Sequence, residues 1–179
     1  LKLGKKILRK TYDHSDGTFK DARFFNPNNL TIFEGLHPFY LSRQRKLFDL
    51  KIFIDPHKDL SSHWKIVRDK NKRGYTKEII LKNIANRAED SKIYIESQAK
   101  YADILIKPSS KKPIKEIGDS SEQIDIGYDI FMSNSIFLEN LIEAFVILPD
   151  LEIHQEYLEG DQQKILISGK VSSDELQEI

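Results

Sequence analysis

The sequence carries an acidic residue at the end of a short apolar run, where it could bind a metal ion or a substrate. Glu34 follows Leu30–Phe33 and stands three residues before His37. In open α/β sheets, ligands bind beyond the carboxyl ends of the strands, and Mg²⁺ prefers hard oxygen ligands that it shares with substrate phosphates. A solvated Glu beside a turn and a hydrogen-bonded structural His are the simpler interpretations of the two residues taken alone.

A basic segment forms a second candidate site. A helical pattern from Trp64 runs into Arg68, Asp69, Arg73 and Gly74. The guanidinium group offers a fixed fork of donors that matches phosphate oxygens, and a helix pair that turns at a Gly can close as a lid. Cations at the C-terminal end of a helix are also favoured by the helix dipole and can face water without any ligand. The segment alone leaves both interpretations open.

A polar loop forms the third candidate. Tyr12, Asp13, His14 and Asp16 surround a turn at Gly17. Their side chains could bind hydroxyl groups or a phosphate. Because turns are rich in these residue types in any case, a plain turn is the favoured interpretation of this stretch by itself.

Short apolar runs and helical patterns predict the elements that must position these residues. In three short runs, apolar and polar residues do not alternate, which is typical of strands covered on both faces. The runs are Leu30–Phe33, Leu50–Ile54 and Ile104–Ile106. Between the second and third runs, Leu60, Trp64 and Val67 predict the buried face of one helix. A second helix is predicted after Gly74, with Thr76 as its N-cap and one face made of Leu81, Ile84, Ala85 and Ala88. The alternation of predicted strands with predicted helices along the chain predicts an α/β unit with a mostly parallel sheet.

The last third of the chain has a different pattern. Strands are predicted at Ile126–Met132, Leu151–Tyr157 and Lys164–Ser168, and a helix is predicted from the spacing of Phe137, Leu141, Ala144, Phe145 and Leu148. Gly160-Asp161 is typical of a hairpin turn, and Ser172 begins the pattern of a last helix. The order β-α-β-β-α predicts a small α+β domain with helices on an antiparallel sheet.

Charge divides the chain, although its 179 residues hold 28 basic and 28 acidic side chains. Residues 1–115 carry 26 of the 28 basic residues and 13 of the 28 acidic ones, so residues 116–179 hold the remaining 2 and 15. The basic part suits anions such as phosphates. We therefore predict a basic α/β domain at 1–112, a linker at 113–123 and an acidic domain at 124–179.

Composition and missing motifs exclude several classes of protein. The hydrophobic share of 39% allows a buried core, and no apolar run approaches the roughly 20 residues that cross a bilayer. The lack of Cys excludes disulfides and thiolate metal sites and favours the reducing cytosol, so we expect a cytoplasmic protein. The patterns GxxxxGK[ST], GxGxxG, HExxH and GxSxG do not occur. The start at Leu1 in a lysine-rich stretch indicates an internal fragment of a longer protein.

Taken in chain order, the three candidate stretches and two strands resemble the phosphoribulokinase/uridine kinase family of P-loop kinases without its N-terminal third. The matching motifs are Tyr12-Asp13-His14 with Gly17-Thr18-Phe19, then Glu34–His37, Asp49–Ile52, Arg68-Asp69 with Arg73-Gly74, and Lys100–Asp103. Five motifs in the right order over about residues 1–107 are more specific than any one of them. The resemblance implies a partial P-loop-kinase sheet with lid helices, followed by the small acidic domain.

The resemblance also implies a reaction and roles for single residues. The reaction would transfer the γ-phosphoryl group of ATP, with Mg²⁺, to a hydroxyl of a sugar phosphate or nucleoside. Glu34 and Asp69 would be the catalytic pair, with Glu34 near the metal or the acceptor hydroxyl and Asp69 orienting the lid. Arg68 and Arg73 would clamp phosphates from the lid. Substrate-binding positions would be Tyr12, His14, His37 and Arg87, although the role of Arg87 stays open.

The same resemblance places the P-loop upstream of Leu1, so we predict that this fragment alone is inactive and holds neither ATP nor Mg²⁺ tightly. The acceptor stays open between ribulose 5-phosphate, uridine or another hydroxyl. A non-catalytic interaction or regulatory module with an anion-binding basic half is the alternative. A nucleic-acid binder is disfavoured because the aromatic residues occupy core-like positions rather than alternating with Lys and Arg. For residues 116–179, a homo-oligomer contact or a docking surface is the hypothesis.

Overall fold

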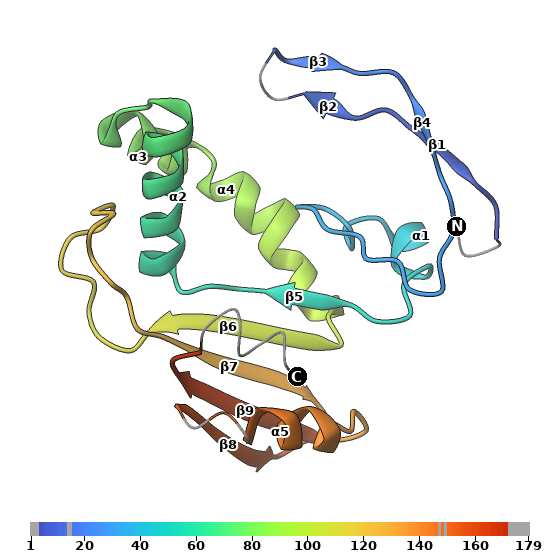
Figure 1. Cartoon of the computed structure of the whole chain (residues 1–179), viewed down its shortest axis with the longest axis vertical. Coiled ribbons are helices and arrows are strands. Elements are labelled where there is room, and N and C mark those ends of the chain that lie inside the picture. The colour runs from blue at the N-terminus through green and yellow to red at the C-terminus, as the bar shows by residue number, and fades with distance from the viewer. Residues whose placement is uncertain (1–3, 14–15, 147, 149, 172–179) are drawn as a thin grey trace. The chain divides into compact units, whose positions relative to one another are not determined.

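The computed structural model of the chain describes residues 4–13, 16–146, 148 and 150–171, and it contains two compact units, Leu1–Leu47 and Phe48–Ile179 (Figure 1). Among the described residues, no helix has the length and apolar character needed to cross a membrane.

The first unit consists of two short β-ribbons and one helical turn. β1 (Ile7–Arg9) pairs antiparallel with β4 (Arg23–Phe25), and β2 (Tyr12–Asp13) pairs antiparallel with β3 (Thr18–Phe19). The helix α1 (Ser42–Arg45) follows. The guanidinium Nη1 of Arg45 donates to the carbonyl oxygens of Phe39 at 2.7 Å and Tyr40 at 2.8 Å, which fixes the turn before the helix.

The strand predicted at Leu30–Phe33 does not form, so that prediction was wrong. Residues 31–34 have no regular backbone structure, and the side chains of Leu30 and Ile32 are 78% and 82% exposed. A strand is stable only where neighbouring strands satisfy its backbone groups and where its apolar side chains are covered. The apolar pattern is present here, but the side chains of Leu30 and Ile32 are not covered.

The second unit is built on a five-stranded sheet with the order β5-β6-β7-β9-β8. The strands are β5 (Ile52–Ile54), β6 (Ile104–Ser110), β7 (Ile126–Ser133), β8 (Leu151–Leu158) and β9 (Gln162–Gly169). β5 and β6 are parallel, as predicted, and every further neighbour in the sheet is antiparallel. The predicted α/β fold is therefore confirmed, with one parallel pair continued by three antiparallel strands in which β9 lies between β7 and β8.

Helices connect the two parallel strands. α2 (Lys58–Arg73) and α3 (Lys77–Asn86) are followed by α4 (Ala88–Asp90), a π-helical turn η1 (Ser91–Ile95) and a 3₁₀ segment η2 (Glu96–Tyr101). Thr76 caps α3 as predicted, because its side chain accepts a hydrogen bond from the backbone N–H of Ile79. Ile80 is the buried residue of α3, whereas the predicted face residue Leu81 is exposed.

The buried face of α2 also differs from the prediction. It consists of Leu60, His63, Ile66 and Asp69, whereas Trp64 is 40% exposed. The sequence pattern counted only apolar residues and therefore chose Trp64 and Val67. Two polar residues take part in the real face because each of them has hydrogen-bond partners there, so their burial leaves no polar group unsatisfied.

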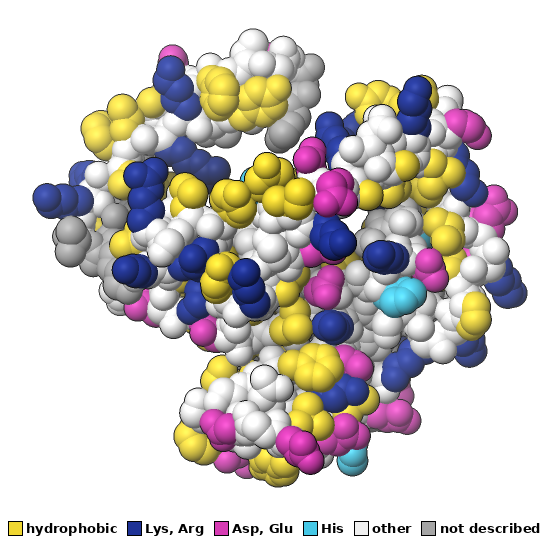
Figure 2. All heavy atoms as spheres, turned by 180° about the vertical axis from the view of Figure 1, so that it is seen from behind, with side chains coloured by type: hydrophobic (Ala, Val, Ile, Leu, Met, Phe, Trp, Pro, Cys, Tyr) yellow, Lys and Arg dark blue, Asp and Glu magenta, His cyan; other side chains and the backbone are white. Residues whose placement is uncertain are grey.

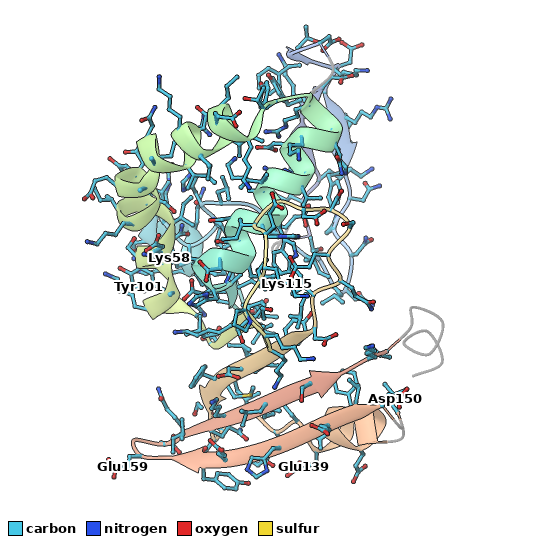
Figure 3. All side chains as sticks on the ribbon, turned by 90° about the vertical axis from the view of Figure 1, so that its left-hand side faces the viewer. Lys58, Tyr101, Lys115, Glu139, Asp150 and Glu159 are labelled. Carbon is cyan, nitrogen blue, oxygen red and sulfur yellow. The ribbon has the colours of Figure 1, made fainter. Side chains whose placement is uncertain are left out.

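The strands β7, β8 and β9 and the helix α5 (Glu139–Val146) reproduce the order predicted for the last third of the chain. In Figure 3, Glu139 marks the start of α5, Asp150 the residue before β8, and Glu159 the turn between β8 and β9. Gly160 and Asp161 in that turn have positive φ angles of 75° and 58°. The helix predicted from Ser172 lies outside the described residues.

The predicted linker, residues 113–123, lies in the loop between β6 and β7. These two strands are paired in register from Ile104↔Met132 to Ser110↔Ile126, so the hydrogen bonds of one sheet join the two predicted domains. The division into compact units falls at residue 47 instead. Figure 2 shows a group of acidic side chains on the lobe that contains β8 and β9, whereas acidic and basic side chains are mixed over the helices.

Candidate functional site

The C-terminal part of α2 carries the cations that could bind phosphate. The helix ends at Gly74, which adopts a left-handed conformation with φ 68° and donates its N–H to the carbonyl oxygens of Asp69 and Lys70. The last turn contains Lys70, Lys72 and Arg73, which the helix dipole stabilises. The chain then turns directly into α3, so the predicted helix pair with a turn at Gly is present.

A buried carboxylate organises this end of the helix. Asp69 is only 2% exposed. Its Oδ1 lies 2.9 Å from Nε of Arg68 and 3.3 Å from Nη1 of Arg73, and its Oδ2 lies 3.0 Å from Nζ of Lys65. We call these four residues the Asp69 cluster. Three cations share one carboxylate, so the cluster keeps an excess of positive charge.

The environment of Asp69 keeps its carboxylate ionised. Burial raises the pKa of Asp69, but hydrogen bonds from Arg68 and Lys65 and the positive charges of both lower it, and the lowering prevails. The Arg68 and Arg73 side chains are each about half exposed, at 51% and 49%. Their guanidinium groups therefore have donors held in place by Asp69 on one side and accessible to an anion on the other.

The structure thus brings together three predicted site residues: Arg68, Asp69 and Arg73. Lys65 belongs to the same cluster but was missed by the sequence analysis, although its spacing of four residues from Asp69 is typical of an ion pair on a helix. Arg87 is exposed at the junction of α3 and α4, where its backbone N–H donates to the carbonyl oxygen of Ile84 at 3.3 Å. Of the described cations, Lys65, Arg68 and Arg73 form ion pairs with Asp69, and Arg87 does not.

The remaining predicted site residues belong to the first unit. Tyr12 lies on β2 opposite Phe19, and their rings meet edge to face with centroids 5.1 Å apart. His14 lies outside the described residues. Glu34 and His37 are exposed. The ring centroids of His37 and Tyr40 are 6.4 Å apart. Because Leu30–Phe33 is not a strand, the expectation that Glu34 stands at a strand end was wrong for this structure.

Among the described residues, no group of three or more His, Asp or Glu side chains is placed to hold a metal ion. Glu34 offers a single hard carboxylate, which fits an ion such as Mg²⁺ when substrate phosphates and waters supply the other ligands. The role of Glu34 as a metal ligand stays a prediction.

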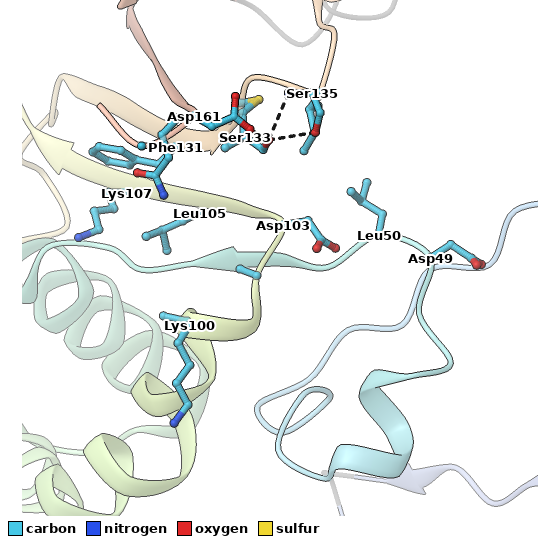
Figure 4. Close-up of a pocket in the computed structure, with 16 residues that line it drawn as sticks. Asp49, Leu50, Lys100, Asp103, Leu105, Lys107, Phe131, Ser133, Ser135 and Asp161 are labelled. Carbon is cyan, nitrogen blue, oxygen red and sulfur yellow. Dashed lines mark hydrogen bonds between the residues drawn. The ribbon is translucent and has the colours of Figure 1, made fainter. Parts of the chain in front are cut away.

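A pocket of about 780 Å³ lies at the edge of the sheet where β6 begins and β7 ends (Figure 4). Asp103 at its wall is bound by Nζ of Lys51 at 2.6 Å. Ser133 lies 2.9 Å from the hydroxyl of Ser135 and 3.4 Å from Oδ2 of Asp161. None of the predicted site residues that the structure describes lines this pocket. It was missed because its residues come from stretches that are far apart in the sequence.

Two known kinases are similar to this chain in sequence. The chain is 40% identical over 106 residues to a phosphoribulokinase of Synechocystis sp., covering 59% of this chain and 32% of that protein. It is 34% identical over 128 residues to a uridine kinase of Macrococcus caseolyticus, covering 70% of this chain and 58% of that protein. The chain therefore spans less than two thirds of either relative.

A solved phosphoribulokinase from Rhodobacter spheroides has a similar fold, with a TM-score of 0.70 and 22% sequence identity over 96% of this chain and 63% of that chain. Residues 1–115, which include the Asp69 cluster, match the family model described as Phosphoribulokinase / Uridine kinase family. The matched residues make up more than half of the 179-residue chain. The chain therefore belongs to the phosphoribulokinase/uridine kinase family.

Proposed function

We propose that this chain supplies the lid and acceptor-binding parts of an ATP-dependent kinase that phosphorylates a hydroxyl of a sugar phosphate or a nucleoside. The observation that carries the proposal is the Asp69 cluster, in which Arg68 and Arg73 are fixed by a buried carboxylate and stay half exposed. Membership of the kinase family supports the same conclusion. Phosphoryl transfer depends mainly on positioning and on neutralising phosphate charge, which is what such a cluster can do.

The chain's own residues would act on the anionic part of the substrates. When bound, ATP supplies the transferred phosphoryl group and Mg²⁺ neutralises part of its charge. Arg68 and Arg73 would bind phosphate oxygens, and Asp69 would hold both guanidinium groups in position. Glu34 would provide a hard oxygen near the metal or the acceptor hydroxyl. Tyr12, His14 and His37 would line the acceptor site, and Arg87 would add a further positive charge.

The acceptor that we favour is a sugar phosphate. The identity to the Synechocystis phosphoribulokinase, at 40%, exceeds the identity to the Macrococcus uridine kinase, at 34%. A phosphorylated acceptor also carries an anionic group that the basic residues of the first half of the chain could bind. Uridine is the second acceptor to be tested.

The chain by itself is expected to be inactive because it contains no GxxxxGK[ST] sequence to surround the phosphates of ATP. The experiment measures ATP turnover with ribulose 5-phosphate and with uridine, for this chain and for a full-length parent that includes the preceding residues. We expect turnover in the parent alone. Turnover by the isolated chain would contradict the predicted inactivity, and a parent inactive with both acceptors would contradict the proposed reaction.

The same experiment includes binding of inorganic tripolyphosphate to the isolated chain by calorimetry. We expect Arg68→Ala and Arg73→Ala each to weaken binding by about tenfold, because each removes a charge-assisted hydrogen-bond donor. Lys58→Ala is the matched control, since Lys58 is exposed at the opposite end of the same helix. Equal losses in all three variants would show that binding depends on overall charge and not on the cluster.

A further inference from the structure

The loop between β6 and β7, residues 111–125, is bound to α2 by a hydrogen bond between residues far apart in sequence. The backbone N–H of Gly118 donates to Nδ1 of His63 at 3.2 Å. His63 is 5% exposed, and Gly118 is buried as well. In Figure 3 the loop that carries Lys115 runs beside α2. We call this loop the clasp loop.

The contact is close as well as polar. A Cβ atom added at Gly118 would lie 2.4 Å from Cγ2 of Ile66, and the φ angle of Gly118 is 93°. Ile66 is one of the fully buried side chains of the unit. A residue with a side chain would therefore push the clasp loop away from α2, and Gly at this position permits the backbone to reach His63.

The clasp loop has an internal framework of its own. The carboxylate of Glu122 accepts the backbone N–H groups of Lys115 at 2.9 Å and Glu116 at 3.1 Å. Asp119 accepts the backbone N–H and the hydroxyl of Ser121, at 2.9 Å and 2.8 Å. These bonds hold the loop as one piece, so a change at Gly118 is expected to move the whole segment rather than a single residue.

His63 must be neutral for this contact to exist. Nδ1 acts as an acceptor, so the proton of the imidazole is on Nε2. A second proton would go to Nδ1 and would point at the N–H of Gly118, which turns an attraction between donor and acceptor into two opposed donors. The charged groups around the contact are Asp119 and Glu116 on the loop, Lys70 on α2, and Lys77 on α3, which lies 3.6 Å from Glu116.

The carboxylates that shape the loop stay ionised as the pH falls to 5. The hydrogen bonds from Ser121 lower the pKa of Asp119 below its ordinary value. The backbone N–H groups of Lys115 and Glu116 likewise lower the pKa of Glu122. Both carboxylates are therefore still ionised at pH 5, whereas imidazole side chains in general take up a proton between pH 8 and pH 5.

We propose that the clasp loop is a pH-sensitive clasp, which holds α2 while His63 is neutral and releases it when His63 takes up a proton. Because α2 also carries the Asp69 cluster, the clasp controls the mobility of the helix from which these cations project. The inference rests on contacts within the second unit and does not depend on the proposed kinase activity.

The test is hydrogen exchange of the full 179-residue chain, followed by mass spectrometry and corrected for the intrinsic effect of pH on exchange. We expect the protection factors of the amides in residues 114–122 to fall by about tenfold from pH 7.5 to pH 5.0. His63→Asn keeps an acceptor oxygen that does not titrate, so its protection is expected to be equal at both values. His154→Gln is the control, because His154 is an exposed histidine on β8, and it should keep the wild-type fall.

A wild-type chain with equal protection at both pH values would overturn the proposal, as would a fall of the same size in His63→Asn. If that variant does not fold, a second measurement on the wild-type chain tests the proposal. The ring-proton resonances of His63 in the wild-type chain are followed by NMR, and their midpoint is compared with the midpoint of the loss of protection. Coinciding midpoints support the proposal, and separate midpoints overturn it.

Discussion

Asp69 is a charged side chain in a buried position, and its three partners explain why this is tolerated. An ionised carboxylate without partners would be costly to bury, whereas Asp69 is within 3.3 Å of cations from Lys65, Arg68 and Arg73. The carboxylate of Asp69 holds the two arginine side chains in position and also stabilises the helix. Removing the carboxylate would leave three like charges close together.

We predict that Asp69→Asn lowers the free energy of unfolding at pH 7 by about 1–3 kcal/mol. Because the pKa of Asp69 is lowered in the folded chain, the carboxylate contributes stability above the ordinary value of 3.8, and this contribution is lost as the pH falls through the lowered pKa. Urea unfolding of both chains from pH 7 to pH 2 checks the prediction. The difference between them should shrink below about pH 4. A constant difference across this range would contradict it.

At the scale of elements, α2 is bound to the clasp loop through a polar residue of its buried face. Its buried face includes the polar residues His63 and Asp69, one of which meets the clasp loop and the other the cations of the same helix. A purely apolar face could slide or rotate against its neighbours at little cost. The hydrogen bond from Gly118 to His63 favours one rotation of the helix, and the bonds of Asp69 within the helix hold Arg68 and Arg73 in position on it.

Substitution of Gly118 tests the closeness of this packing. Gly160→Ala is the matched control, because both glycines have positive φ angles, but a Cβ at Gly160 would meet nothing within 4 Å. We expect Gly160→Ala to cost about 1 kcal/mol from backbone strain. Gly118→Ala should cost a further ~1–3 kcal/mol, because its Cβ would clash with Ile66. Thermal unfolding of the two variants measures the difference, and equal costs would show that the loop can move aside freely.

At the scale of the whole molecule, the family match and the folded unit do not end at the same residue. The family model covers residues 1–115, whereas the sheet continues through β7, β9 and β8. The fold likeness to the Rhodobacter structure extends over 96% of the chain and so includes most of this continuation. Met132 and Ile165, two buried core residues, lie on these later strands. The acidic part is thus a structural continuation of the sheet.

We therefore predict that a chain cut after residue 115 is less stable than the full chain and self-associates. The cut would remove the strand that pairs with β6 over Ile104–Ser110 and would leave the backbone of β6 unpaired on that side. Urea unfolding and sedimentation of residues 1–115 and 1–179 compare the two. A shortened chain that is monomeric and equally stable would contradict the prediction, because it would show that residues 1–115 do not need the later strands of the sheet.

The sequence alone determined several of the local elements and indicated the family. Thr76 and Gly74 mark the ends of two helices, Gly160-Asp161 marks a hairpin, and these signals depend only on backbone preferences of the residues themselves. The motif that contains Arg68, Asp69 and Arg73 was also readable, because its members are close in sequence and lie on one helix.

The tertiary structure decided which of these patterns are used and what they contact. Leu30–Phe33 has the composition of a strand but is not one, because a strand requires neighbours that no local pattern can guarantee. The buried face of α2, the joining of β6 to β7 across the predicted linker, and the contact of His63 with Gly118 all involve residues that are brought together by folding. Burial and pairing depend on the partner as well as on the residue, so only the folded chain could reveal them.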